Sequence, residues 1–189
     1  MSAPTFLTFF RSAGRIITLG IGCGNGWMTH RMACMEHCEV YGLDLNQPEL
    51  EQGARIFPDK NNLTFLYGNI FENILLPEFF DLVTLAGSVQ YFKSIVKLLE
   101  RCFFYLREKG EVHLIDSPFY TQKTVGAARE RSKSYYEDLG YPEMASCYHH
   151  HLYSDLHTFH PGFFIQPRRS YPADPKEVFQ SSPLPLSLD

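Results

Sequence analysis

Four glycines at alternate positions are the part of the chain best suited to holding a ligand. Gly20, Gly22, Gly24 and Gly26 follow a short apolar run, and Asp44 stands 20 residues beyond Gly24 at the end of a second apolar run. Glycine lets the backbone approach a bound group, because a Cβ would block that approach or the dihedrals of the turn. A carboxylate at this spacing can accept hydrogen bonds from both hydroxyls of a ribose. The pattern therefore predicts a site for a cofactor that contains a nucleoside.

The order of the glycines separates two classes of cofactor. Dinucleotide-binding proteins use GxGxxG, whose third glycine allows close packing of helix on strand. Counting from Gly22 puts Trp27 at that third position, and counting from Gly20 puts Asn25 there. The pattern present is GxGxG. A nicotinamide-dependent oxidoreductase is therefore an alternative that the missing third glycine disfavours.

Short apolar runs recur along the first two thirds of the chain and predict the strands of a sheet. This sheet would position the glycines and Asp44. The length of these runs and their flanking turn residues are typical of buried strands. Five strands are expected, at residues 15–21, 39–45, 62–67, 80–85 and 111–115.

Helical patterns separate most of these strands. We expect helices at residues 27–33, after Pro48 with a stripe of Leu50, Ala54 and Phe57, and at 93–106, ended by Lys109-Gly110. Alternating strands and helices predict an α/β fold with a mostly parallel, doubly wound sheet and helices on both faces.

The character of the chain changes after Asp116. Residues 121–139 are polar and helical in pattern, residues 140–154 are rich in Tyr and His, and one further strand is expected at 163–166. Six of the twelve prolines lie at or beyond Pro161. We expect one domain over residues 1–168 with abbreviated C-terminal strands, and a Pro-rich tail over 169–189. A substrate cap would come from an N-terminal arm at 1–14 and from 117–160.

Composition limits the partners and the compartment. The chain is 44% hydrophobic and 20% charged, with a net charge of −4, which excludes a disordered chain and disfavours nucleic-acid binding through bulk basic charge. Its five cysteines have no CxxC spacing, so no disulfide framework or zinc ribbon is expected. No apolar run approaches the length of a membrane helix. These features predict a cytoplasmic protein with no nucleic-acid or membrane partner; they leave its oligomeric state open.

Taken together, the motifs resemble one family. ITLGIGCGNG followed by VYGLDLN is similar to the class I (Rossmann-like) S-adenosylmethionine-dependent methyltransferases. LTFLYGNIF, FDLVTLAGSVQYF and YLREKGEVHLIDSPFY resemble the third, fourth and fifth strand motifs of that family, in the family's order. The resemblance covers residues 15–120. It implies a three-layer Rossmann-like sandwich, S-adenosylmethionine as cofactor, and transfer of its methyl group to a small molecule.

The resemblance also implies a role for residues that follow the first four strands. Gly22, Gly24 and Gly26, with Gly20 ahead of them, would wrap the methionine part of the cofactor; Asp44 would hold the ribose and Leu45 pack on the adenine; Asn69 and Ile70 would lie at the adenine edge; Ala86, Gly87 and Ser88 would lie beside the methionine. Two positions depart from the family's pattern. The family usually has an acidic residue in place of Gly20 and an aspartate in place of Asn69, although Asn still offers a carbonyl to the adenine amino group.

Methyl transfer from a sulfonium is an in-line displacement, in which the protein mainly aligns the reacting groups. A general base is needed only when the acceptor must lose a proton. The candidates near the ends of the fourth and fifth strands are Tyr91, Asp116, Tyr120, Tyr148, His149, His150 and His151. Each also has a structural interpretation, such as Asp116 capping the loop after the fifth strand. Consecutive histidines in an extended segment point to alternate sides, so no metal site is expected.

Two further questions stay open at this point. A non-catalytic module that binds the cofactor is an alternative to an enzyme, since no motif names a methyl acceptor. Arg129, Arg131 and Lys133 are expected on a solvated helix face; as part of a lid, their charges would recognise an anionic substrate.

Overall fold

The computed structural model describes residues 14–162, and its centre is a five-stranded sheet in which every strand runs parallel to its neighbours. The strands are β1 (Ile16–Ile21), β2 (Cys38–Asp44), β3 (Leu63–Tyr67), β4 (Phe80–Ala86) and β5 (Leu106–Ile115). Their order across the sheet is β3-β2-β1-β4-β5, so the switch point lies between β1 and β4. The predicted α/β, doubly wound parallel sheet is confirmed.

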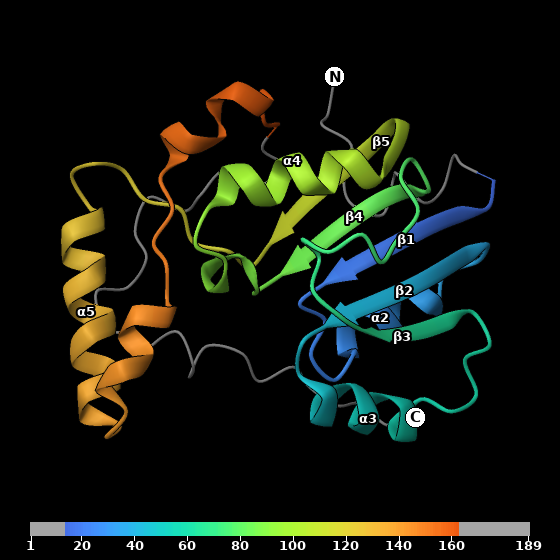
Figure 1. Ribbon diagram of the computed structural model, residues 1–189, viewed down its shortest axis with the longest axis horizontal. Coiled ribbons are helices and arrows are strands. Elements are labelled where there is room, and N and C mark those ends of the chain that lie inside the picture. Colours follow the sequence, from blue (N-terminus) through green and yellow to red (C-terminus); the bar gives the residue numbers. More distant parts are fainter. Residues whose placement is uncertain (1–13, 163–189) are drawn as a thin grey trace, which may run out of the picture.

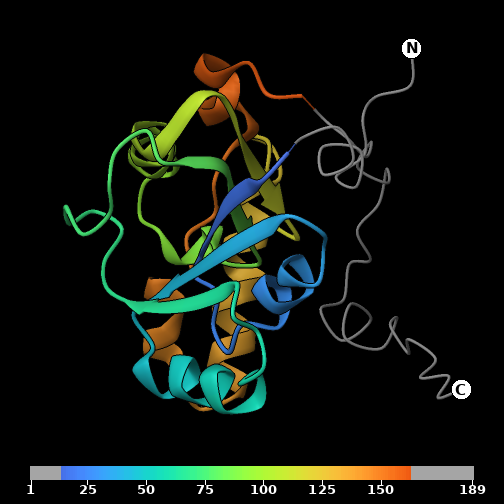
Figure 2. The ribbon, with the colours of Figure 1, turned by 90° about the vertical axis from the view of Figure 1, so that its right-hand side faces the viewer.

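Helices cover both faces of this sheet. The helices are α2 (Trp27–Ala33), α3 (Gln47–Ile56), α4 (Ile95–Tyr105) and α5 (Val125–Asp138), with 3-10 turns η1 (Val89–Tyr91), η2 (Pro142–Cys147) and η3 (Tyr153–Phe159). Figure 2 shows α2 and α4 on opposite sides of the sheet, which gives the three expected layers.

The main core lies between the sheet and α4. Leu19, Leu43 and Val83 project from neighbouring strands and meet Leu98 and Tyr105 of the helix, and each is at most 1% exposed. Burying each such side chain contributes about 1.5–3 kcal/mol. The helix begins at Ser94, whose side chain accepts a hydrogen bond from the Lys97 backbone N–H. This cap fixes the start of α4 two residues after the predicted one.

On the face of the sheet opposite α4, small residues allow helix α2 to pack close to the strands. Gly20 lies beside Gly42 of β2 and Thr84 of β4. A Cβ on Gly20 would lie 2.6 Å from the Cγ2 atom of Thr29 on α2. Glycine at this position therefore allows α2 to pack directly on the centre of the sheet.

Two local expectations are wrong. The helix before β5 ends at Tyr105, and Lys109-Gly110 lies within the β5 strand instead of stopping the helix. Phe80 pairs with Leu106, whereas Leu82 pairs with Glu111, so the intervening residues bulge out of the ladder. In a bulge the extra residues are unpaired, and Lys109 accordingly has a φ of 67°.

The second correction concerns α3. Its buried residues are Leu50 and Gly53, whereas Ala54 of the expected stripe is exposed. A Cβ on Gly53 would lie 2.4 Å from the backbone oxygen of Asn25. The helix thus faces the glycine loop through a glycine, which a search for apolar side chains does not count.

The residues after β5 form a cap. Figure 1 shows α5 and η2 side by side beyond the carboxyl ends of the strands. The segment that follows η2 returns to the sheet, where Leu152 makes an isolated parallel bridge with Tyr120. Residues 14–162 contain no strand after β5 beyond that bridge, and the strand expected at 163–166, like the N-terminal arm and the tail, lies outside the described residues. No helix in the described range is long and apolar enough to span a bilayer.

Candidate functional site

The glycine loop that follows β1 has a backbone that few other residues could adopt. Gly22, Gly24 and Gly26 have φ angles of +65°, +55° and +82°, in the left-handed region that costs an L-residue about 1–2 kcal/mol. The N–H groups of Gly22 and Cys23 both donate to the Leu43 carbonyl, at 2.8 and 3.3 Å. The loop is thereby fixed to the end of β2.

Packing around the loop excludes side chains as strictly as the dihedrals do. A Cβ on Gly22 would lie 2.5 Å from the Cβ of Ser88, and one on Gly26 would overlap the ring of Phe65. Ser88 is itself held in place, because its hydroxyl donates to the Ile21 carbonyl at 2.9 Å. The glycine pattern is thus required by the fold as well as by any ligand.

Asp44 stands where the sequence predicts an acidic group, at the carboxyl end of β2. Its Oδ2 atom accepts a hydrogen bond from the Gly24 N–H at 2.7 Å, and its Oδ1 atom accepts one from the Asn46 N–H at 2.8 Å. A carboxylate has about four acceptor positions, so each oxygen keeps one for a ligand. The same side chain therefore shapes the loop and offers hydrogen-bond acceptors next to it.

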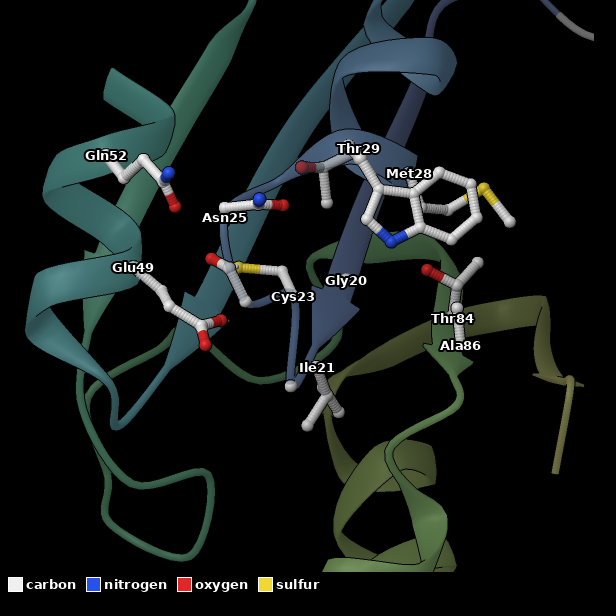
Figure 3. A pocket seen from close by; sticks show the side chains of 13 residues that line it. Gly20, Ile21, Cys23, Asn25, Met28, Thr29, Glu49, Gln52, Thr84 and Ala86 are labelled. Atoms are coloured by element: carbon white, nitrogen blue, oxygen red, sulfur yellow. Dashed lines mark hydrogen bonds between the residues drawn. The ribbon is translucent and has the colours of Figure 1, made fainter. Parts of the chain in front are cut away.

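A cavity of about 230 Å³ opens beside the glycine loop. Figure 3 shows Glu49 and Gln52 of α3 on one side of the loop, with Thr84 and Ala86 of β4 on the other. Several residues that line this cavity were not expected at a ligand site from the sequence: Trp27, Met28, Thr29, Glu49, Gln52 and Thr84. Two of them follow a predicted site residue closely, since Trp27 comes directly after Gly26 and Glu49 five residues after Asp44.

Cys23 lies within the loop but is not suited to nucleophilic chemistry. Burial raises the pKa of the Cys23 thiol to about 12, and the nearby carboxylates of Asp44 and Glu49 add to this rise. Its sulfur would be 2.9 Å from a Cβ on Gly42. The side chain is therefore a neutral thiol that fills the space between loop and sheet.

The residues assigned to the adenine differ in how much surface they present. Leu45 is 61% exposed directly after Asp44, whereas Ile70 is 3% exposed and belongs to the main core. The Ile70 carbonyl already accepts from Arg101 Nε at 2.9 Å. The Asn69 side-chain oxygen accepts from the Phe71 N–H at 3.1 Å. Leu45 and Asn69 thus lie where a ligand can reach them, while the Ile70 side chain has a packing role.

The carboxyl end of β4 completes the wall of the site. Ala86 lines the cavity. Gly87 follows with a φ of +62°, and no heavy atom lies within 4 Å of where its Cβ would be. Its N–H donates to the Ile115 carbonyl at 2.9 Å. The turn after β4 is therefore fixed to β5 and leaves open space beside the backbone.

The structure brings four of the catalytic candidates together in one aromatic cluster. The ring centroids of Tyr91 and Tyr148 are 6.4 Å apart, and those of Tyr148 and His150 are 5.1 Å apart. The centroid of the Tyr120 ring is 5.2 Å from that of His150, and the centroid of Tyr136 on α5 is 6.4 Å from that of Tyr148. This aromatic cluster joins η1, α5 and the segment after β5.

The side chains of His150 and His151 have different hydrogen-bond partners. Burial and the nearby Arg129 guanidinium lower the pKa of His150, whose Nε2 atom lies 3.0 Å from the Ser132 hydroxyl. Burial lowers the pKa of His151 as well. The Nε2 of His151 lies 3.1 Å from the Val89 carbonyl, and because a carbonyl only accepts, this nitrogen carries the proton.

The remaining two candidates contribute differently. The His149 backbone N–H donates to the Gln90 carbonyl at 2.7 Å, so this residue connects the segment to η1 through its main chain. Asp116 is exposed, with a φ of 50° at the end of β5. No hydrogen bond within residues 14–162 joins it to the aromatic cluster. Over the same residues, no three His, Cys, Asp or Glu side chains lie close enough together to hold a metal ion.

Comparisons with known proteins agree with this architecture. Residues 18–110 match the family model for a methyltransferase domain. The YcgJ protein of Bacillus subtilis is similar in structure, with a TM-score of 0.66 at 15% identity over 80% of this chain and 62% of its own. A putative sarcosine dimethylglycine methyltransferase from Galdieria sulphuraria has a TM-score of 0.61 at 14% identity, over 69% of this chain and 51% of its own.

A third structure is described by its cofactor. A putative S-adenosyl-L-methionine-dependent methyltransferase from Methanococcus maripaludis has a TM-score of 0.51 at 15% identity, over 67% of this chain and 60% of its own. This chain thus spans about three fifths of the length of the Bacillus protein. No curated protein matches the sequence.

The matched segment runs from β1 into β5 and contains the glycine loop, Asp44 and the turn after β4. The order of the strands and the position of the loop are those expected from the motifs. Over residues 18–110 the chain therefore matches a methyltransferase domain, its fold is Rossmann-like, and S-adenosylmethionine is the cofactor that this match implies.

Proposed function

We propose that this protein is an enzyme that transfers a methyl group from S-adenosylmethionine to a small molecule bound under the cap. The observation that carries the proposal is the Asp44 carboxylate, which holds the glycine loop at Gly24 and keeps acceptor capacity on both oxygens. The loop, the cavity of about 230 Å³ and the turn after β4 surround the same end of the sheet.

The residues present fit this cofactor. The open space at Gly87 can take a ligand that a side chain would displace. The exposed apolar surface of Leu45 beside Asp44 suits an adenine ring that packs next to its ribose. Gly20 takes the place of the acidic residue usual in the family, and its Cβ position is filled by Thr29. We therefore assign the amino group of the methionine part to other acceptors at the cavity, where Glu49 is the one carboxylate among the described lining residues.

When bound, S-adenosylmethionine supplies a methyl group already activated on a sulfonium. The work left to the chain is to align the acceptor and to keep water away from it. Tyr91 and Tyr148, which contact each other across η1 and the cap, are placed to provide an apolar wall for the acceptor. His150 is held neutral by burial and by Arg129, so its imidazole can accept a proton if the acceptor must lose one.

Two measurements test the proposal. Calorimetric titration with S-adenosylhomocysteine should give a Kd in the micromolar range or below. Assays for release of S-adenosylhomocysteine should then detect turnover with at least one member of a broad panel of small acceptors. An absence of binding at high micromolar concentration contradicts the proposal for both enzyme and module.

Binding without turnover on such a panel would favour the non-catalytic module. This alternative is supported by Gly20, which stands where the family usually has an acidic residue. By contrast, no described feature favours a nicotinamide cofactor, because the position of a third glycine is occupied by Trp27, which lines the cavity.

A further inference from the structure

A second cavity lies under the cap, away from the glycine loop, and we call it the cap cavity. Its volume is about 540 Å³. It is lined by Arg129 and Lys133 of α5, by Lys93 after η1 and by the segment 148–151, together with parts of η2. These elements come from three separate parts of the chain, so the cavity exists only in the folded cap.

Positive charge gathers around the cap cavity in a chain whose net charge is −4. Arg129 and Lys133 are four residues apart and so lie on one face of α5, and Lys93 approaches from η1. Within residues 14–162, no ion pair joins Arg129 or Lys93 to a carboxylate. Lys133 has only an exposed contact of 3.9 Å with Glu137, which is worth little.

The two acidic groups at the cavity offset only part of this charge. Glu130 and Asp155 also line it, so the lining carries three cationic and two anionic side chains. The Asp155 carboxylate accepts the Leu152 N–H at 3.1 Å, which directs it toward the backbone of its own segment. His150 adds a neutral imidazole, since Arg129 and burial disfavour its protonation. The cavity therefore presents three cations against two carboxylates, together with the imidazoles of His149, His150 and His151 and the Tyr148 ring.

The cap cavity is also connected to the end of β4. Its lining residues His149 and His151 are hydrogen-bonded to the carbonyls of Gln90 and Val89 in η1. That turn directly follows Gly87 and Ser88. A group held in the cap cavity is therefore one short 3-10 turn from the cofactor side of β4.

From this arrangement we infer that the cap cavity binds an anionic group of the methyl acceptor, a carboxylate or a phosphate, with Arg129 as the main contact. The guanidinium matches both groups because it can donate two parallel hydrogen bonds. Tyr148 would contact the apolar part of the same molecule. The inference rests on the proposed function for the role of the ligand as acceptor, but the binding of an anion can be tested without turnover.

The experiment uses the full chain saturated with S-adenosylhomocysteine and three probes of similar shape. Phenyl phosphate and benzoate carry the two anions, and benzamide is their neutral counterpart. Calorimetry or ligand-observed NMR should show the better of the two anions binding at least tenfold more tightly than benzamide. The stronger anion then identifies which of the two groups the cavity prefers.

Variants of α5 assign the effect to the cavity. Arg129→Gln should weaken binding of the preferred anion about tenfold, and Arg129→Lys should restore part of it. Arg131→Gln is the matched control, because Arg131 lies on the same helix but does not line the cavity. Its charge acts on His150 from outside the cavity, so its removal should weaken binding far less than Arg129→Gln does. Thermal unfolding of each variant checks that the cap is folded.

Three results would overturn the inference. They are equal binding of benzamide and both anions, unchanged anion affinity in folded Arg129→Gln, and equal losses in Arg129→Gln and Arg131→Gln, which would indicate general surface charge. Failure of S-adenosylhomocysteine to bind is a separate result. It contradicts the proposed function, and the probes can then be titrated alone to decide whether the cap cavity binds anions.

Discussion

The glycine loop and the cap cavity present their polar groups to ligands by different means. At the loop, the backbone is shaped by left-handed glycines and by the Asp44 carboxylate, which accepts from the Gly24 N–H and keeps acceptor positions for a ligand. In the cap cavity the polar groups belong to side chains such as Arg129, Lys133 and His150. A backbone site depends on dihedral angles, so few sequences can form it, whereas a side-chain site can change its ligand by single substitutions. The comparison explains why a cofactor can be assigned here and an acceptor only proposed.

The sharpest test of the backbone site is Gly22→Ala. An alanine there adopts a φ of +65° and places its Cβ 2.5 Å from that of Ser88. We expect the free energy of unfolding to fall by about 2–4 kcal/mol, from backbone strain and overpacking together. Chemical denaturation measures this change.

The control for Gly22→Ala is Gly126→Ala in α5. Nothing lies within 4 Å of its Cβ position and its φ is not positive, so alanine should stabilise the helix by about 0.5–1 kcal/mol. If the two substitutions changed the free energy of unfolding by similar amounts, the loop would be no less tolerant of side chains than the cap.

A smaller effect is expected from Asp44→Ala. The substitution removes the acceptor for the Gly24 N–H and the proposed acceptor for the ribose. Affinity for S-adenosylhomocysteine should fall by about 1–3 kcal/mol, the range for a lost charge-assisted hydrogen bond. Titration calorimetry gives the value, with Glu51→Gln on the exposed side of α3 as the control. Unchanged affinity would exclude Asp44 from ribose binding.

The cap should show a dependence on pH that the loop does not. Because burial lowers the pKa of His151 in the folded protein, the unfolded chain binds a proton first as the pH falls below about 6.5. Stability from the neutral imidazole is therefore complete above that pH and is lost as the pH falls toward the folded-state pKa. His151→Gln keeps a hydrogen-bond donor for the Val89 carbonyl but does not titrate.

The measurement compares melting temperatures at pH 7.5 and 5.5. The decrease should be smaller in His151→Gln than in the wild type, and His157→Gln, at an exposed histidine, should match the wild type. An equal decrease in all three proteins would show that His151 does not contribute to the pH dependence of the cap.

The smallest expected effect is a lack of reaction at Cys23. With its pKa raised to about 12, this thiol should remain unmodified by iodoacetamide at pH 7.5, because the thiolate is the reactive form. The exposed Cys34 and Cys147 should be alkylated under the same conditions. Peptide mass spectrometry distinguishes the three. Modification of Cys23 at the rate of Cys34 would mean that the loop opens readily.

The sheet and loop could be predicted from the sequence because each depends on local patterns. Buried strands such as Ile16–Ile21 are continuous apolar runs, and the positive φ angles of the loop need glycine. The β5 bulge could not be predicted, since Lys109-Gly110 has the same local pattern whether it ends a helix or interrupts a ladder. Register between β4 and β5 decides between them, and that is a long-range property.

The structure of the cap was harder still to predict, because it depends on contacts between distant parts of the chain. Arg129 and Arg131 are equivalent in the sequence as charges on one polar helix, yet only Arg129 lines the cap cavity. Which face of α5 turns inward depends on packing against η2 and the 148–151 segment. Ile70 is the reverse case, since the family pattern assigns it to the ligand and the core takes its side chain.

Arg101 of α4 holds the loop after β3 in place through hydrogen bonds to residues 70–73. Besides the Ile70 carbonyl, its guanidinium contacts the Glu72 carbonyl and the Asn73 side chain, while Tyr105 also donates to Glu72. These bonds join residues about thirty positions apart, and contacts of such long sequence separation carry a larger loop-closure cost. We therefore expect the loop after β3, where the sequence predicts the adenine edge of the cofactor, to take shape only after α4 has docked. Cofactor binding during refolding would then report the completion of the domain as a whole, because the glycine loop also depends on a distant contact, from the Ser88 hydroxyl to the Ile21 carbonyl.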